Sequence, residues 1–341
     1  MSKLDALQIS LLCQEYRGHA TLPKDAIEAL GSEVTNTPYG MLAVDTRGEM
    51  AESGMLGHRI YMYNMAARQW EVSRKIIPTR ILASDQFPLT SMLTCMSDGR
   101  VMICSNRKEE AGIAPRVLMF DPLSPDNSDA AFEILVDPKK TAHRDQGSLV
   151  TLHSGDVLRV GGESIRGSKS NCALFNHRTK KWAIVGGHDM MRESFCVVLQ
   201  NGQVLITGGS DGRHIVSGCS LYSVQTNTFR ATTGMRHERR MHEGCLMSNG
   251  NVFVCGGISY TNGDDRCEEY NVATGTWNIL ANLPRPSIMH HCILLPDGNI
   301  LVWMPRGYYT VFDPINNSFG AVARDVLLDA PVRYVTLALT L

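Results

Sequence analysis

The chain has 341 residues, of which 43% are hydrophobic and 20% charged, a composition typical of a folded globular protein rather than a disordered one. Its 33 basic and 34 acidic side chains give a net charge of -1, so no overall field draws it to nucleic acid or to an anionic membrane. We therefore expect neither as a partner.

Residues 1–38 precede the first recognisable repeat and are expected to be an N-terminal extension. Asp5, Gln8 and Ser10 interrupt their apolar residues and no small-residue cleavage site follows, so the start does not resemble a signal peptide. No run of about 18 apolar residues occurs, which argues against a membrane-spanning helix. The ten cysteines are scattered through apolar segments, so we expect reduced core thiols and a cytoplasmic protein.

From residue 39 onward the sequence repeats itself with a period of about 40 to 50 residues, which is typical of propellers and solenoids. The first copy is the most degraded: Arg47-Gly48 stands where the others have a turn, and only Tyr63 and Trp70 keep the aromatic spacing. The second copy opens at Asp98-Gly99, and the last at Asp297-Gly298. Six copies follow one another, approximately at 39–76, 90–136, 146–186, 194–233, 243–281 and 290–323.

Three central copies align without a gap over 154–162, 201–209 and 249–257. Each has a polar residue and glycine at a turn, an apolar strand, and then a glycine pair. Glycine at that place permits positive φ or a close approach of the backbone to a neighbouring blade. The glycines of these pairs, to which we assign a structural role, are Gly161, Gly162, Gly208, Gly209, Gly256 and Gly257.

Two aromatic residues follow each glycine pair and are expected to face each other across a hairpin. One copy is therefore predicted to be a four-stranded antiparallel meander. The first aromatic ends strand three, and the second begins strand four. Such a sheet cannot bury both faces alone, so several sheets should stack around an axis. The aromatics to which we assign a structural role are Trp70, Trp182, Trp277, Tyr222 and Tyr270.

A glycine pair with a spaced tyrosine and tryptophan, as in Gly256-Gly257, Tyr270 and Trp277, resembles the blade motif of the kelch repeat family. The resemblance covers residues 39–323 and implies an all-β, six-bladed kelch-type β-propeller of four-stranded antiparallel blades. Residues 324–341 contain a further strand that could close the ring. It either joins residues 7–12 in a composite seventh blade or adds a strand to a six-blade ring.

Kelch propellers are typically protein-interaction scaffolds that hold a partner on the face carrying the inter-blade loops. Here those loops are rich in arginine and histidine (141–145, 191–194, 235–242 and 283–291), and arginine forks match the geometry of carboxylates. We therefore expect another protein, bound through an acidic peptide or acidic surface, as the partner. The candidate binding residues are Arg192, Ser194, Arg236, Arg239, Arg240, His242, Arg285 and Ser287.

Two alternatives stay open for these residues. Kelch repeats commonly use an arginine and a histidine here to pack blades, and the periodic placement of His242 and His290 favours that role. The loops between strands two and three (106–115, 163–169, 210–214 and 259–265) vary in length and sign. That variation fits either a surface adapted to one partner or loops under no constraint.

An enzymatic function is the less favoured reading. No sequence motif for a zinc site, a nucleotide site or a hydrolase occurs, so we expect no metal and no cofactor. His290-His291, Cys292 and Tyr308-Tyr309 supply the residue types of kelch-related copper radical oxidases but not their spacing. The remaining alternative is a small kelch enzyme such as a sialic-acid-type sugar isomerase, with Glu193, Glu238 or Glu243 as its carboxylate.

Overall fold

The computed structural model describes much of the repeat region and part of the C-terminal segment. The predicted extension 1–38, with the segment 7–12, lies outside the described residues, as do the loops 106–115, 141–145 and 163–169. The described residues are 39–45, 49–50, 56–64, 69–78, 92–104, 116–122, 124, 128–136, 147–162, 171–187, 192–260, 262–288, 290–325 and 332–336.

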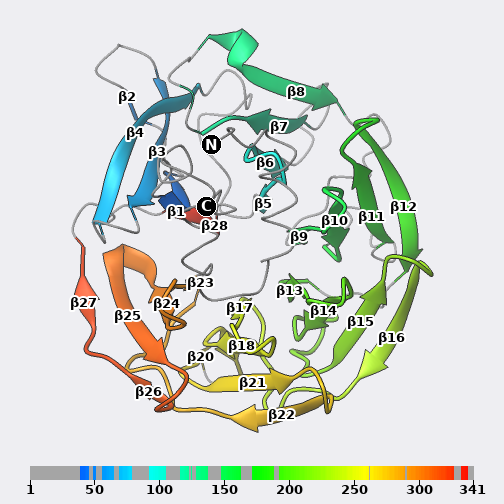
Figure 1. The fold of residues 1–341 in the computed structure, drawn as a ribbon, viewed down its shortest axis with the longest axis vertical. Helices are drawn as coiled ribbons and strands as arrows, with labels where there is room; N and C mark the ends of the chain where they lie inside the picture. The colour runs from blue at the N-terminus through cyan, green and yellow to red at the C-terminus, as the bar shows by residue number, and fades with distance from the viewer. Residues whose placement is uncertain are drawn as a thin grey trace, which may run out of the picture.

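Sheets of antiparallel strands stand around a centre like blades, and in five of them the first strand is innermost and the last lies at the rim (Figure 1). The described residues contain no α-helix. Three of the sheets are β5 (Met92–Cys95), β6 (Val101–Cys104), β7 (Arg116–Phe120) and β8 (Phe132–Val136); β9 (Ser148–Thr151), β10 (Val157–Val160), β11 (Asn171–Asn176) and β12 (Lys181–Gly187); and β13 (Phe195–Val198), β14 (Val204–Thr207), β15 (Cys219–Ser223) and β16 (Thr228–Thr232).

Short 3-10 helices occur at η2 (Asp129–Ala131) and η3 (Pro305–Gly307), and β19 (Ile258–Ser259) pairs with β20 (Asn262–Gly263) in a separate hairpin. Two further sheets follow the same strand order as the three above. The two sheets are β17 (Glu243–Leu246), β18 (Val252–Cys255), β21 (Cys267–Asn271) and β22 (Thr276–Ile279); and β23 (His291–Leu294), β24 (Ile300–Trp303), β25 (Tyr308–Asp313) and β26 (Ser318–Phe319), with β27 (Ala323–Arg324) also on β25. In the described chain, five sheets thus have the predicted blade form, one fewer than the six copies predict.

The sheet at the first repeat is built differently from the prediction. It contains β1 (Tyr39–Asp45), β2 (Glu49–Met50), β3 (Leu56–Asn64), β4 (Gln69–Pro78) and β28 (Val332–Thr336). Met41 pairs with Tyr63 as Val204 pairs with Tyr222, so β1 occupies the position of a second strand. The expectation that Arg47-Gly48 joins a first strand to a second is wrong, because the strand on the inner side of β1 is β28 from the other end of the chain.

The second strand of each regular sheet forms the most buried part of the fold. All four residues of β6, β10, β14, β18 and β24 are buried. Apolar clusters join neighbouring sheets: one combines Phe253 of β18 with Phe312 of β25, whose ring centroids lie 4.9 Å apart. Nine cysteines of the described chain are free thiols, eight of them buried.

The aromatic pairs of the repeats lie directly opposite each other on the third and fourth strands. Tyr270 is the register partner of Trp277, and their ring centroids are 5.1 Å apart. Trp277 is 1% exposed, and its indole N–H donates to the carbonyl oxygen of Thr233 at 2.9 Å. The corresponding pairs of the other sheets have centroid separations of 4.6 to 5.8 Å.

The glycine pairs lie where inter-blade loops approach the ends of the second strands. Gly256 and Gly257 have φ of 60° and 98°, and the N–H of Gly257 donates to the carbonyl oxygen of Ser287 at 2.8 Å. A Cβ on Gly256 would lie 2.7 Å from the Ser287 oxygen, and one on Gly257 2.6 Å from the Arg240 oxygen. The pair thus lets two loops contact one strand end.

No helix long and apolar enough to span a membrane occurs in the described chain.

Candidate binding face

Two equivalent inter-blade loops fix the positions of Arg192 and Arg240. Arg192, before β13, exchanges backbone hydrogen bonds with Ser210, at 2.9 and 2.8 Å. Arg240, before β17, exchanges them with Ile258, at 3.1 and 2.8 Å. Each loop is therefore tied to the segment that follows the second strand of its own sheet, and the two arginines have matching positions in neighbouring blades.

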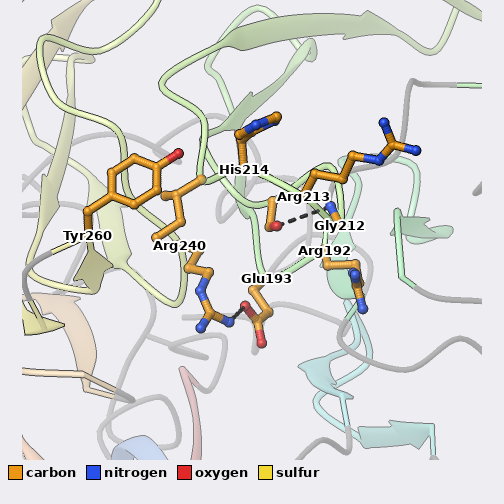
Figure 2. Close-up of a pocket in the computed structure, with 9 residues that line it drawn as sticks. Arg192, Glu193, Gly212, Arg213, His214, Arg240 and Tyr260 are labelled. Carbon is orange, nitrogen blue, oxygen red and sulfur yellow. Dashed lines mark hydrogen bonds and ion pairs between the residues drawn. The ribbon is translucent and has the colours of Figure 1, made fainter.

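The two arginines line a pocket between these neighbouring sheets (Figure 2). Its volume is about 330 Å³, at the lower end of the range of small-molecule and peptide-side-chain sites. The walls come from both inter-blade loops, from the loop between β14 and β15, and from the end of β19. The lining residues are Arg192, Glu193, Ser210, Gly212, Arg213, His214, Ile215, Arg240 and Tyr260.

The pocket is basic, because three guanidinium groups outnumber the single carboxylate in its lining. That carboxylate belongs to Glu193, which forms an ion pair with Arg240 and is only 5% exposed in its side chain. Glu193 has a φ of 58°, a left-handed conformation that is uncommon for a residue with a side chain. A backbone held in this way at a pocket wall indicates a position fixed by its surroundings.

Arg213 and His214 project from a loop that is ordered by its own aspartate. The Asp211 carboxylate accepts hydrogen bonds from the backbone N–H of both residues, at 2.7 and 2.6 Å. These backbone hydrogen bonds lower the pKa of Asp211, and the bond from His214 has the larger effect. The side chains of Arg213 and His214 are exposed, as is Tyr260 at 64%. The turn thus presents a cation and an imidazole ring at the pocket, and the segment after β19 adds the Tyr260 ring.

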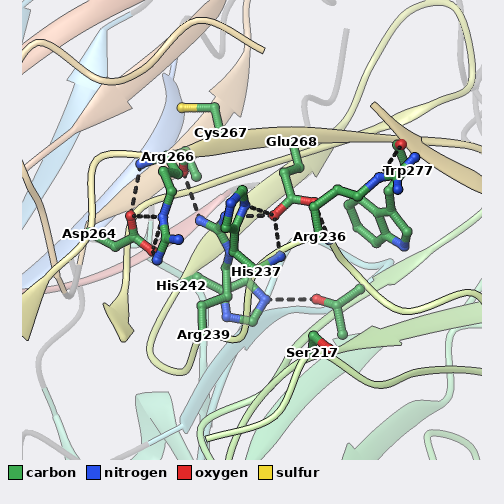
Figure 3. A network of polar contacts seen from close by, with 12 residues as sticks. Ser217, Arg236, His237, Arg239, His242, Asp264, Arg266, Cys267, Glu268 and Trp277 are labelled. Carbon is green, nitrogen blue, oxygen red and sulfur yellow. Dashed lines mark hydrogen bonds and ion pairs between the residues drawn. The ribbon is translucent and has the colours of Figure 1, made fainter. Parts of the chain in front are cut away.

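Arg239 does not offer a guanidinium to a partner, contrary to the sequence-based expectation. It is fully buried, and its guanidinium donates to the carbonyl oxygens of Gly256 and Arg266, at 3.0 and 2.7 Å (Figure 3). It also forms an ion pair of 2.8 Å with Glu268, which is itself fully buried. Arg239 therefore fixes its loop against the β17–β22 sheet. This is the role in blade packing that the sequence left open as an alternative to partner binding.

Glu268 organises this network, and nothing in the sequence pattern singled it out. Its carboxylate also accepts hydrogen bonds from the backbone N–H of Arg236 at 2.6 Å and of His237 at 3.2 Å. Beside it, Asp264 and Arg266 form a bridge of 2.7 Å. Burial raises the pKa of Asp264, but the Arg266 hydrogen bonds outweigh burial and the pKa is lowered. Together these contacts hold the loop with charge-assisted hydrogen bonds.

Three smaller candidates are also buried, so the prediction that they contact a partner is corrected. His242 is 2% exposed, and its Nε2 lies 2.8 Å from the Thr207 hydroxyl. Burial lowers the pKa of His242 well below its ordinary value, so the ring is neutral. Ser194 and Ser287 are each 5% exposed. The carbonyl of Ser287 accepts the Gly257 N–H, which is a structural contact.

Arg236 and Arg285 are exposed but are not among the residues that line the pocket. The side-chain N–H of Arg236 donates to the carbonyl oxygen of Trp277 at 3.4 Å. The Arg285 guanidinium lies 4.2 Å from the centroid of the Tyr308 ring, a cation–π contact between the loop before β23 and strand β25 (Tyr308–Asp313). Of the eight candidates, the structure brings Arg192 and Arg240 together in one pocket.

The blade order, the buried second strands and the inter-blade contacts define the fold as a β-propeller. Among protein-family models, the Kelch motif matches residues 240–284, which span the β17–β22 sheet with its glycine pair and its tyrosine–tryptophan pair. The matched repeat and the propeller arrangement together support a kelch-repeat β-propeller. No curated protein matches its sequence.

Proposed function

We propose that this propeller is a protein-interaction scaffold that binds an acidic segment of a partner in the pocket between the β13–β16 and β17–β22 sheets. The basic lining carries the proposal: Arg192, Arg213 and Arg240 surround one opening whose only carboxylate is already paired. A carboxylate of the partner would bind Arg213 and Arg192. Tyr260 would pack against the apolar part of the same segment.

Kelch propellers are commonly interaction scaffolds, and the described face accords with that role. The loops are fixed by backbone pairing and by the buried Arg239–Glu268 pair, so the pocket is preformed. A preformed site loses less conformational entropy when it binds. We keep the cytoplasmic location as a prediction, and the free thiols of the described chain fit a reducing compartment.

We also infer that the ring has six blades, the first composed of β28, β1, β3 and β4. Two observations support this inference. β28 pairs along β1, so the two ends of the chain would meet in one sheet. Trp303 of the β23–β27 sheet stacks on Trp70 of β4, with ring centroids 5.6 Å apart and planes 10° apart, and so joins the last repeat to the first.

The proposed ligand class can be tested with fluorescently labelled peptides rich in aspartate and glutamate. We expect the wild-type protein to bind such peptides and Arg213→Glu to weaken binding at least about tenfold, a loss of about 1.4 kcal/mol. The matched control is Arg230→Glu. This exposed arginine lies on β16 of the same sheet and outside the pocket lining, and its replacement changes the net charge equally.

Equal weakening in both variants would mean that overall charge, and not the pocket, attracts the peptide. Absence of binding to every acidic peptide would contradict the proposed ligand class. Incubation with a sialic acid serves as a second arm: chemical conversion of the sugar would support the isomerase alternative and displace the scaffold proposal.

A further inference from the structure

A buried group of thiol and imidazole side chains lies at the junction of the β17–β22 and β23–β27 sheets, outside the pocket lining. Cys255 ends β18, Cys292 lies in β23, and His290 directly precedes β23. The Cys255 and Cys292 sulfurs are 3.5 Å apart, and the Cys255 sulfur is 3.3 Å from His290 Nε2. All three ligand atoms lie within 4.8 Å of one another, and the residues are 0%, 2% and 3% exposed.

These separations are close to those of ligands around one tetrahedral metal ion. Metal–sulfur bonds of about 2.3 Å and metal–nitrogen bonds of about 2.0 Å place two sulfurs about 3.8 Å apart and a sulfur about 3.5 Å from a nitrogen. The two distances from the Cys255 sulfur are shorter than these by a few tenths of an ångström, and the third, between the Cys292 sulfur and the His290 ring nitrogen, is at most 4.8 Å. Admitting an ion would therefore require small movements of these side chains.

We propose that Cys255, His290 and Cys292 bind a thiophilic metal ion with a filled d shell, Zn²⁺ or Cu⁺. Thiolate and imidazole ligands favour these ions over Mg²⁺ or Ca²⁺, which prefer oxygen. The surroundings add more soft sulfur, because Met247, Cys267 and Met304 belong to the same buried cluster. The ion would add a metal-mediated link between two blades that already contact each other through apolar side chains and through hydrogen bonds such as that from the Gly257 N–H to the Ser287 carbonyl oxygen.

Binding would exchange protons for metal. Burial raises the pKa of Cys292 to about 11, so the thiol is protonated at neutral pH when no ion is bound. Burial lowers the pKa of His290 to about 3, so its ring is neutral. Its Nε2 donates to the Cys255 carbonyl oxygen at 3.0 Å, so ligation through Nε2 requires that the ring proton move to Nδ1 and that this hydrogen bond be given up. As each sulfur–metal bond forms, its thiol proton leaves to solvent, and affinity should therefore rise with pH.

The preceding blade junction supplies an internal comparison. His242 stands at the position of His290, but its Nε2 contacts the Thr207 hydroxyl, which stands where Cys255 does. The position of Cys292 is taken by Gly244, as the strand registers show. The histidine is thus common to both junctions, whereas the two thiols are added at one of them.

The test is an anaerobic titration of the purified full-length protein with Co²⁺, Zn²⁺ and Cu⁺, each added alone after removal of bound metal. We expect one ion per chain, sulfur-to-cobalt charge-transfer absorption, and a higher melting temperature with the bound ion. Cys292→Ser should weaken binding at least about hundredfold, since even indirect metal contacts are worth 10- to 100-fold. Competition between Zn²⁺ and Cu⁺ identifies the preferred ion.

The matched control is Cys196→Ser, because Cys196 is a buried thiol at the same strand position two blades earlier. It should leave metal binding unchanged. Failure of the wild-type protein to bind any of the three ions, or equal loss in both serine variants, would overturn the proposal. If Cys292→Ser does not fold, His290→Gln takes its place, and unchanged binding in that variant would also overturn the proposal.

Discussion

Replacement of Arg239 by alanine should destabilise the propeller by about 3 to 5 kcal/mol, the usual cost of removing one partner of a buried ion pair. Arg239 and Glu268 are both fully buried, and their closest atoms are 2.8 Å apart. The substitution would also leave the carbonyl oxygens of Gly256 and Arg266 without their guanidinium donor. Most of the loss therefore comes from polar groups that stay buried without partners.

Urea denaturation followed by tryptophan fluorescence measures this loss as a shift of the unfolding midpoint. The control is Arg285→Ala, which removes an exposed guanidinium from the face of Tyr308 and should cost less than about 1 kcal/mol. Replacing both members of the pair, with Arg239→Met and Glu268→Leu, should recover only part of the stability: no charge is then left unpaired, but the backbone groups that the two side chains bind still lose those partners. A loss below about 1 kcal/mol for Arg239→Ala would refute the assigned role.

Three other outcomes follow from the structure. Trp277→Ala should cost about 3 to 5 kcal/mol in denaturation experiments, whereas Ile279→Ala, at a 63% exposed residue, should cost less than about 1. Gly257→Ala should cost about 1 to 3 kcal/mol because of its positive φ and its contact with Arg240. Folding lowers the pKa of His290 from 6.5 to about 3, so as pH falls the unfolded chain binds a proton at this histidine before the folded protein does. The free energy of unfolding should therefore decline as pH drops below about 6.5, and His290→Gln should reduce that decline.

The repeat and its strand order could be read from the sequence, because they depend on local patterns. The glycine pair Gly256-Gly257 marks where two loops meet a strand end, and the spacing of Tyr270 and Trp277 gives their cross-strand pairing. Both signals recur at a fixed period, so each copy supports the others. The sequence predicted a further strand in residues 324–341, either with residues 7–12 or added to a six-blade ring, but it did not name β1 as the partner of β28, because that pairing joins distant segments and leaves no periodic trace.

The candidate site was only partly predictable, because the sequence gives the charge of a loop residue but not its burial. Arg192 and Arg240 line the pocket, whereas Arg239, next to Arg240 in the same loop, is turned into the protein. The difference depends on Glu268, which lies on another strand and carries no motif. Arg213 is the arginine of the loop 210–214 between strands two and three. The sequence did not decide whether loops of this class bind a partner, so Arg213 was not among the candidates.

The most direct test of the central claim is hydrogen exchange, measured by mass spectrometry, with and without the tightest-binding acidic peptide. The proposed site predicts slower exchange of backbone amides at 210–215 and 239–241 when the peptide is bound, with no change along β16 at the rim. Protection confined to the rim strands would contradict the account, because it would place the ligand on the outer edge of a blade and not in the pocket between two blades.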